Sequence, residues 1–207
     1  MVTARSSAST RKRAPRAAGD APLVLREEEL LDALETIFLR DGFRDVTVDQ
    51  LARDLRCSKR TVYELAPSKE ELFLRVFDRY LSRLREEGNR GAATAAPIDA
   101  FTPYFAPAID AARKLSATLM RDMTAYAPAN EMWERHQLER MTGLRKLVER
   151  CVEEKIFRNA NPYLVAEVFA ASLRRIREPK FLSTSKLSYR EALSELYGLL
   201  LHGLMHP

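Results

Sequence analysis

The chain has 207 residues, of which 46% are hydrophobic and 30% charged, a balance that suits one small and one larger folded domain, each with its own core. Its 34 Lys and Arg against 29 Asp and Glu give a formal net charge of +5, no run approaches the ~18 to 20 apolar residues of a membrane span, and no apolar signal segment follows the basic N-terminus. Two cysteines make no disulfide framework in a chain of this size, so we expect a cytoplasmic protein without membrane contact.

Residues 1–22 are expected to form a disordered basic arm, because they are rich in Ala, Ser and Thr and lack apolar periodicity. The arm contains one acidic residue, Asp20, and its positive charges are Arg5, Arg11, Lys12, Arg13 and Arg16. Such an arm suits contact with a nucleic-acid backbone or minor groove, but a solubilising tail would have the same composition.

Residues 23–85 are predicted to form a helical domain that opens with a supporting helix. Its apolar positions at helical spacing are Leu30, Leu31, Leu34, Ile37 and Phe38. The run Glu27 to Glu29 suits the positive end of that helix dipole. Gly42 can take the left-handed conformation that ends a helix, and Phe43 can then pack back onto it.

Two short helices follow, separated by a tight turn. Thr47 with Gln50 forms a capping box, and Ser58 is an N-cap ahead of a basic first turn. This spacing is typical of a helix-turn-helix, which places the start of its second helix against base edges in the DNA major groove. A third cap, Ser68 with Glu71, opens a long connecting helix.

The segment resembles the tetracycline-repressor (TetR) family of bacterial transcriptional regulators. The resemblance rests on Asp41-Gly42-Phe43, on Thr47 to Ala52, on Ser58 to Tyr63 and on Pro67 to Leu72. Two departures stand out. Arg56-Cys57 replaces the usual glycine and small β-branched residue of the turn, and Ala66 replaces an aromatic residue. A non-glycine residue in a left-handed turn costs on the order of 1 kcal/mol, so the turn is either strained or differently built.

The resemblance and the position of the second helix together predict the DNA contacts. These residues are Thr47, Ser58, Lys59, Arg60, Thr61, Tyr63 and Lys69. Arg60, Thr61 and Tyr63 would meet bases and backbone, whereas Thr47 and Lys69 would hold phosphates. Tyr63 has an alternative role as a packing aromatic.

Residues 86–97, with Gly88, Gly91 and Pro97, are predicted to be a linker to a second helical domain at 98–207. Its helices are expected at 98–113, 115–126, 130–155, 161–177 and 188–204, with Pro103 and Pro107 interrupting or kinking the first of them. Asn130 and Asn161 are expected caps, and Ser188 with Glu191 forms a further capping box. The fold class is therefore all-α: a three-helix DNA-binding domain, a connecting helix and a C-terminal bundle.

The helices at 161–177 and 188–204 are apolar over more than one face, which predicts a partner outside their own domain. The family resemblance implies a homodimer through these two helices, and a dimer would read two half-sites of a palindromic operator. A thicker monomer core is the alternative.

Aromatic and methionine side chains on three successive helices predict a pocket for an apolar or aromatic effector. The candidate lining is Phe101, Tyr104, Phe105, Met120, Met123, Tyr126, Trp133 and His136. A filled core would show the same pattern.

Catalytic motifs are lacking: the chain has no glycine-rich phosphate loop and no nucleophile elbow. His202 and His206 are four apart but have no third ligand nearby, so we expect no metal, no cofactor and no enzyme. Cys57 could in principle act as a redox switch beside basic neighbours, although a small buried thiol is the simpler interpretation.

The sequence thus predicts a DNA-binding transcriptional regulator, a repressor released from its operator by a small molecule. The rival hypothesis is an all-helical small-molecule-binding or scaffold protein without specific DNA binding.

Overall fold

A computed structural model describes residues 23–205, and the basic arm predicted at 1–22 and His206 lie outside that range. The helices in the described part are α1 Leu23–Asp41, α2 Val48–Asp54, α3 Lys59–Leu65, α4 Lys69–Ala93, α5 Phe101–Ala111, α6 Ala117–Ala125, α7 Ala127–Glu153, α8 Pro162–Ile176, α9 Pro179–Ser185 and α10 Tyr189–Leu204. Over this range the only β pairing is one isolated bridge between Phe157 and Met205. The all-α prediction is confirmed.

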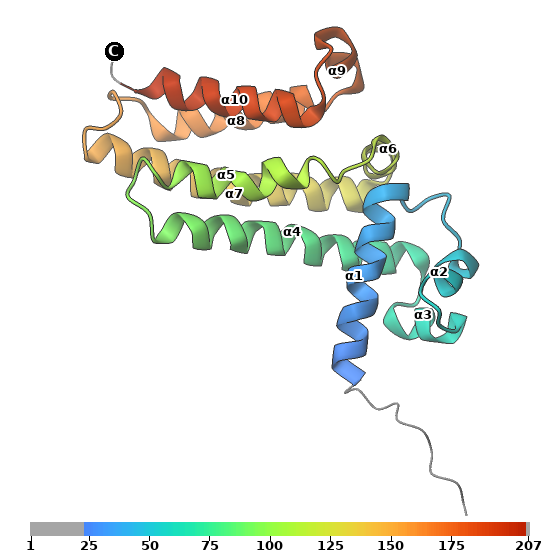
Figure 1. Ribbon diagram of the computed structural model, residues 1–207. Coiled ribbons are helices and arrows are strands. Elements are labelled where there is room, and N and C mark those ends of the chain that lie inside the picture. The colour runs from blue at the N-terminus through green and yellow to red at the C-terminus, as the bar shows by residue number, and fades with distance from the viewer. Residues whose placement is uncertain (1–22, 206–207) are drawn as a thin grey trace, which may run out of the picture.

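The helices stack in layers (Figure 1). α4 packs against α5 and α7, α8 packs on the other side of α7, and α10 lies beside α8 and α5. α1 contacts α4 and α6, while α2 and α3 form a compact pair at the end of the molecule where α4 begins. The two-helix unit is therefore carried at the tip of the long helix α4.

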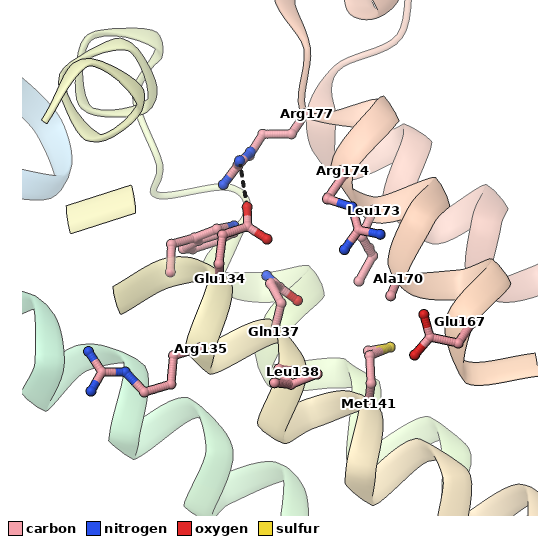
Figure 2. A pocket seen from close by; sticks show the side chains of 11 residues that line it. Glu134, Arg135, Gln137, Leu138, Met141, Glu167, Ala170, Leu173, Arg174 and Arg177 are labelled. Carbon is pink, nitrogen blue, oxygen red and sulfur yellow. Dashed lines mark hydrogen bonds and ion pairs between the residues drawn. The ribbon is translucent and has the colours of Figure 1, made fainter. Parts of the chain in front are cut away.

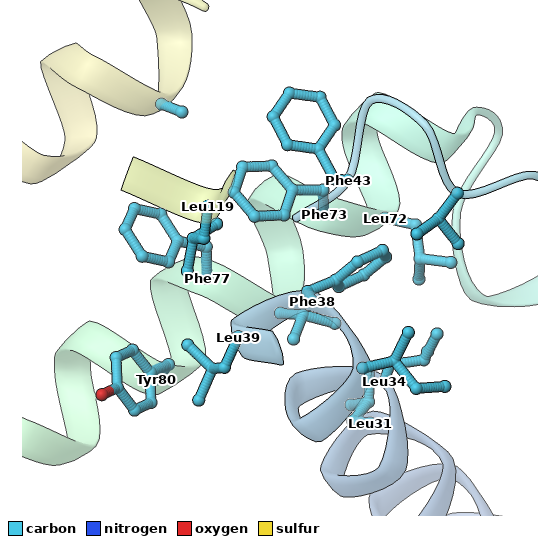
Figure 3. Close-up of a cluster of buried hydrophobic side chains, with 14 of the residues drawn as sticks. Leu31, Leu34, Phe38, Leu39, Phe43, Leu72, Phe73, Phe77, Tyr80 and Leu119 are labelled. Carbon is cyan, nitrogen blue, oxygen red and sulfur yellow. The ribbon is translucent and has the colours of Figure 1, made fainter. Parts of the chain in front are cut away.

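One hydrophobic core joins α1, α4 and α6 with the start of α7 (Figure 3). Phe43, just after α1, stacks on Phe73 of α4 with ring centroids 4.1 Å apart, and Phe73 stacks on Phe77 at 5.3 Å. Phe77 in turn stacks on Trp133 of α7 at 6.3 Å. The expected packing of Phe43 is thus continued into a column of aromatic rings that links the first helical unit to α7.

Ion pairs along the outer side of α1 tie it to α4. The pairs are Arg75–Glu27, Arg79–Glu28, Arg79–Asp32 and Arg83–Glu35. Exposed pairs contribute little singly, but a series of neighbouring pairs on two helices also fixes their relative rotation. Glu27 and Glu28, assigned from sequence to the helix dipole, therefore serve to join α1 to α4.

A second core fills the space among α5, α7, α8 and α10. Phe105 is its centre: the ring meets Phe169 of α8 edge-on at 5.2 Å and lies 4.8 Å from Tyr197 of α10. Cys151 is buried in this core. The two cores divide the aromatic residues of the C-terminal domain between them.

The linker predicted at 86–97 is largely helical, because α4 continues to Ala93. Its glycines do not break the helix; they let α5 approach closely. A Cβ added at Gly88 would lie 2.8 Å from the carbonyl oxygen of Tyr104, and one added at Gly91 would lie 2.8 Å from Cβ of Pro103. The actual connection between α4 and α5 is the shorter segment 94–100.

Two further helix boundaries differ from the sequence predictions. α7 begins at Ala127 with Tyr126 as its N-cap, so Asn130 lies within the first turn and is not the cap. Pro128 is tolerated there because the first helical N–H groups have no intrahelical acceptor. α9, which also starts with a proline and ends at Lys186 in the left-handed region, was not predicted.

Candidate nucleic-acid interface

The turn between α2 and α3 is left-handed at a residue that is not glycine. Arg56 has φ 50, and the N–H of Cys57 donates to the carbonyl of Ala52 at 2.9 Å, which closes the end of α2. Of the two possibilities that the sequence leaves for this turn, the chain adopts the strained one. Leu51, Ala52 and Val62 are buried beneath it and fix the angle between the two helices.

Ser58 and Thr61 are joined at the start of α3. Ser58 Oγ accepts from the N–H of Thr61 at 3.1 Å, and the two side-chain oxygens lie 2.9 Å apart. Ser58 is therefore an N-cap, as predicted, and its hydroxyl is engaged in holding the first turn. Thr61 is half-buried beside it.

Lys59, Arg60 and Tyr63 form the outward face of α3. The Arg60 side chain is 88% exposed, and Tyr63 is 53% exposed. An aromatic ring that is this open does not pack in a core, so the packing alternative for Tyr63 is wrong. This face presents two long donors and one aromatic ring to solvent, groups of the kind that contact bases and phosphates.

Both cations of this face are paired with carboxylates of the same small unit. Lys59 forms an ion pair with Asp49 of α2, and Arg60 Nε donates to Glu64 Oε1 at 2.9 Å. These side chains are largely exposed, so each pair is weak and can be exchanged for a phosphate or a base edge.

The two predicted phosphate contacts lie at neighbouring helix starts. Thr47 caps α2: its Oγ1 accepts from the N–H of Gln50 at 3.2 Å, and its own N–H donates to Gln50 Oε1 at 2.8 Å. Lys69 Nζ, at the start of α4, donates to the carbonyl of Arg44 at 2.6 Å. Arg44 is exposed and adds a cation that the sequence analysis missed, although it directly follows the Asp41-Gly42-Phe43 motif.

A redox role for Cys57 finds no support. The thiol is half-buried, and burial raises the pKa of Cys57, while Arg26 has the smaller, opposite effect. A reactive cysteine needs a lowered pKa, so the structure favours the simpler interpretation of Cys57 as a small, partly buried thiol.

The loop after α1 is anchored by a buried carboxylate from α6. Asp122 Oδ2 accepts from the N–H of Phe43 at 2.9 Å and from the N–H of Arg44 at 3.1 Å. Gly42, with φ 75, lies directly against this carboxylate, and a Cβ there would be 2.4 Å from Asp122 Oδ2. The C-terminal domain thus holds the backbone just ahead of α2.

The eight residues proposed as an effector pocket do not line one cavity. Phe101, Tyr104 and Phe105 belong to the second core, whereas Met120, Met123, Tyr126 and Trp133 belong to the first. The structure does not bring all eight together, because successive helices turn their aromatic faces toward different cores.

Three of the eight residues do meet: Phe105, Trp133 and His136 line a cavity of about 30 Å³ between the two cores. A larger cavity of about 310 Å³ lies between α7 and α8, and Figure 2 shows side chains of both helices facing each other across it. Arg177 Nη2 and Glu134 Oε1 form an ion pair of 2.9 Å at its edge. Trp133, Gln137 and Leu173 line both cavities.

α8 and α10 also carry apolar side chains on their outer surfaces. Their exposed fractions are 61% for Tyr163, 61% for Leu164, 58% for Val168 and 73% for Leu199. These residues come from the two helices that the sequence assigns to a subunit interface.

Within residues 23–205 no group of three or more His, Cys, Asp or Glu side chains could hold a metal ion. None of the helices described here is both long enough and apolar enough to cross a membrane.

Known proteins resemble this chain in sequence over the DNA-binding unit and in fold over most of its length. Residues 30–76 match the family described as bacterial regulatory proteins, tetR family. No curated protein matches the chain.

Three solved structures illustrate the likeness of fold. A transcriptional regulator from Cytophaga hutchinsonii has a TM-score of 0.70 at 16% identity, covering 86% of this chain and 98% of its own. A putative transcriptional regulator from Saccharomonospora viridis, in complex with choline, has a TM-score of 0.67 at 14% identity, covering 89% and 100%. The TetR family regulator PfmR from Thermus thermophilus has a TM-score of 0.59 at 21% identity, covering 86% and 99%.

The match over 30–76 covers most of α1, all of α2 and α3, and the start of α4, and it includes the exposed cations and the strained turn. The chain as a whole shares the fold of such regulators. Residues 30–76 thus form the DNA-binding unit of the tetR family of bacterial regulatory proteins.

Proposed function

We propose that this protein is a sequence-specific DNA-binding transcriptional regulator, a repressor that binds a palindromic operator as a homodimer and is released by a small molecule. The observation that carries the proposal is α3, a recognition helix whose Lys59, Arg60 and Tyr63 face solvent on a rigid two-helix unit. A regulator of bacterial DNA acts in the cytoplasm.

The outer faces of α8 and α10 support dimerisation. Tyr163, Leu164, Val168 and Leu199 are large apolar side chains that project from the surface of one protomer. Pairing these helices with those of a second copy would bury them in a four-helix interface. One helix-turn-helix reads only a few base pairs, and a two-fold dimer doubles the sequence that is read.

Two connections support control of DNA binding from the C-terminal domain. The aromatic column runs from Phe43, ahead of α2, through Phe73 and Phe77 to Trp133, which lines both cavities beside α7. Asp122 forms the second connection, through its two hydrogen bonds to the same loop. A ligand that moves α7 would therefore shift the support of the recognition helix. The choline complex of the Saccharomonospora viridis regulator shows that a protein of this fold accommodates a small molecule.

The test is binding to DNA selected from a random pool by the full-length protein. A palindromic consensus is expected, and the affinity for it should fall steeply as salt rises, since phosphate contacts release counterions. Arg145→Ala, at an exposed arginine of α7, is the matched control for any arginine replaced in α3 and should leave binding unchanged.

The rival hypothesis is a small-molecule-binding or scaffold protein without specific DNA binding. Its signature in the same experiment is a pool that yields no enriched sequence and an affinity for duplex DNA that does not depend on Arg60. Either of these results would overturn the regulator proposal.

A further inference from the structure

Arg140 is a buried cation on α7 for which the described part of the chain supplies no anion. The residue is 5% exposed, and its guanidinium makes one long hydrogen bond, from Nη2 to the carbonyl of Tyr104 at 3.4 Å. Its Cζ lies 5.2 Å from the ring centre of Tyr104 and 5.7 Å from that of Phe105. Arginine stays charged inside proteins, and an uncompensated buried charge is costly.

The carboxylates that neighbour Arg140 on α7 are already paired with other arginines. Glu139 pairs with Arg85 of α4 at 2.8 Å, and Glu134 pairs with Arg177 at 2.9 Å. Arg140 therefore gives this part of the interior a positive charge that the surrounding protein does not balance.

Four uncharged polar side chains line the cavity together with Arg140: Tyr80, His136, Gln137 and Tyr189. Arg85 Nη1 lies 3.1 Å from His136 Nδ1, and because arginine can only donate, Nδ1 accepts and Nε2 carries the hydrogen. Burial, reinforced by Arg140 and Arg85, lowers the pKa of His136 to about 3, so the ring is neutral at pH 7. Tyr80, which also lines the cavity, has a buried hydroxyl that finds no partner among the described residues.

The remaining walls of this cavity are apolar and come from α4, α5, α7, α8 and α10. The large apolar side chains among them include Leu84, Phe105, Leu115, Trp133, Phe169 and Leu193. A cation and neutral donors set in an apolar wall match a ligand with an anionic head and an apolar body.

We propose that this cavity binds an organic carboxylate, whose carboxylate pairs with Arg140 and whose apolar part lies among Phe105, Trp133 and Phe169. The effector role of this carboxylate rests on the proposed function, whereas its binding to the cavity does not. A cationic ligand is disfavoured by the charge of Arg140.

Binding requires the cavity to enlarge, because about 30 Å³ holds little more than a water molecule. Cavities of about 310 Å³ and 240 Å³ adjoin it: the first shares Trp133, Gln137 and Leu173, and the second shares Leu84 and Arg140. A ligand that displaces Trp133 or Leu173 would join these spaces and separate α7 from α8. Since Trp133 stacks on Phe77, the same displacement would act on the aromatic column that reaches Phe43.

The test uses 1-naphthylacetate and decanoate, each compared with its uncharged amide, as probes of thermal unfolding and calorimetric binding to the full-length protein without DNA. Both carboxylates, or the one that fits, should bind at least about tenfold more tightly than the matching amide and raise the Tm. Arg140→Met should abolish that preference, whereas Arg140→Lys should keep part of it because the charge remains. Arg145→Met, the same change at an exposed arginine of α7, should leave the preference intact.

A readout without ligand guards against a variant that simply misfolds. Replacing an unpaired buried charge with an apolar side chain of similar size removes a desolvation cost, so Arg140→Met should unfold at a Tm no lower than that of the parent protein. The proposal is overturned if no carboxylate outcompetes its amide, or if Arg140→Met retains the preference. Since DNA is absent throughout, failure here leaves the regulator proposal standing, and failure of operator binding leaves this site standing.

Discussion

Arg60 and Lys69 are both cations of the DNA-binding unit, but they differ in what holds them. Arg60 projects from α3 into solvent and is paired only with Glu64 of the same helix, whereas the Lys69 ammonium is bound to the carbonyl of Arg44. An exposed, fork-shaped donor suits a base edge, and a point charge held at a helix start suits a phosphate.

Arg60→Ala should therefore weaken operator binding by about 1 to 3 kcal/mol and relax the preference at one base position. Lys69→Ala should weaken the binding of all duplexes to a similar extent. Titrations with the selected operator and its single-base variants distinguish the two patterns. Unchanged affinity and preference in Arg60→Ala would remove this residue from the recognition surface.

Arg56, with φ 50, is strained in a way that glycine would relieve. Arg56→Gly should stabilise the folded protein by up to about 1 kcal/mol, reduced by the extra freedom that glycine gives the unfolded chain. Arg53→Gly, within α2, is the control and should cost about 1 kcal/mol. Urea unfolding measures both, and a loss of stability in Arg56→Gly would show that the side chain makes a contact worth more than the strain.

His136 should make stability depend on pH. Its pKa is about 3 in the folded protein, against 6.5 for an unperturbed histidine, so between these values the unfolded chain binds the extra proton. Its contribution is thus complete above pH 6.5 and is lost as the pH falls toward 3, with a slope of up to about 1.4 kcal/mol per pH unit.

The matched variant for this pH dependence is His136→Gln, which should flatten the profile between pH 6.5 and 4.5. Chemical unfolding at half-unit intervals measures the slope. Parallel profiles for the two proteins would mean that His136 is protonated in the folded state.

At the scale of the elements, the starts of α2, α3, α8 and α10 were predictable because a side-chain cap is a local interaction, whereas α7 and α9, which have no such cap, were not. Thr47, Ser58, Asn161 and Ser188 each accept the hydrogen bond that their spacing implies. A side chain three residues ahead of the amide that it caps needs no information from elsewhere in the chain.

What could not be predicted depends on contacts between helices. In the sequence, Gly88 and Gly91 indicate a break between helices, but in the structure they form the surface of α4 against which α5 packs. Arg140, a charged residue in an otherwise ordinary helix, gives no sign in the sequence that it lies in the interior. The eight residues predicted to line one pocket divide between two cores for the same reason: the rotation of each helix about its axis decides which core an aromatic ring enters.

The apolar outer faces of α8 and α10 lead to a prediction about assembly. Leu164→Glu or Leu199→Glu should shift the protein from dimer to monomer, because a charge would be buried without a partner at the centre of the interface. Leu138→Glu, at a comparably exposed leucine of α7, should remain dimeric. Sedimentation velocity gives the mass, and an unchanged dimer in both interface variants would place the interface elsewhere.

For the molecule as a whole, the important feature is that its DNA-binding surface carries its own counterions. The charge of +5 is small for a protein of 207 residues, and on the recognition unit Asp49 and Glu64 accompany Lys59 and Arg60. If Lys59 and Arg60 contact DNA as proposed, phosphates or bases must replace these carboxylates each time the protein binds DNA.

These ion pairs affect how long the protein remains bound to DNA other than its operator. On arbitrary DNA the two cations exchange one carboxylate for one phosphate and gain little, so residence there is short and the net release of salt ions is smaller than the number of contacts suggests. At the operator, hydrogen bonds to base edges add binding free energy that the exchange of carboxylate for phosphate does not supply. The intramolecular pairs therefore act mainly against non-specific residence, which shortens the search of a chromosome for one site.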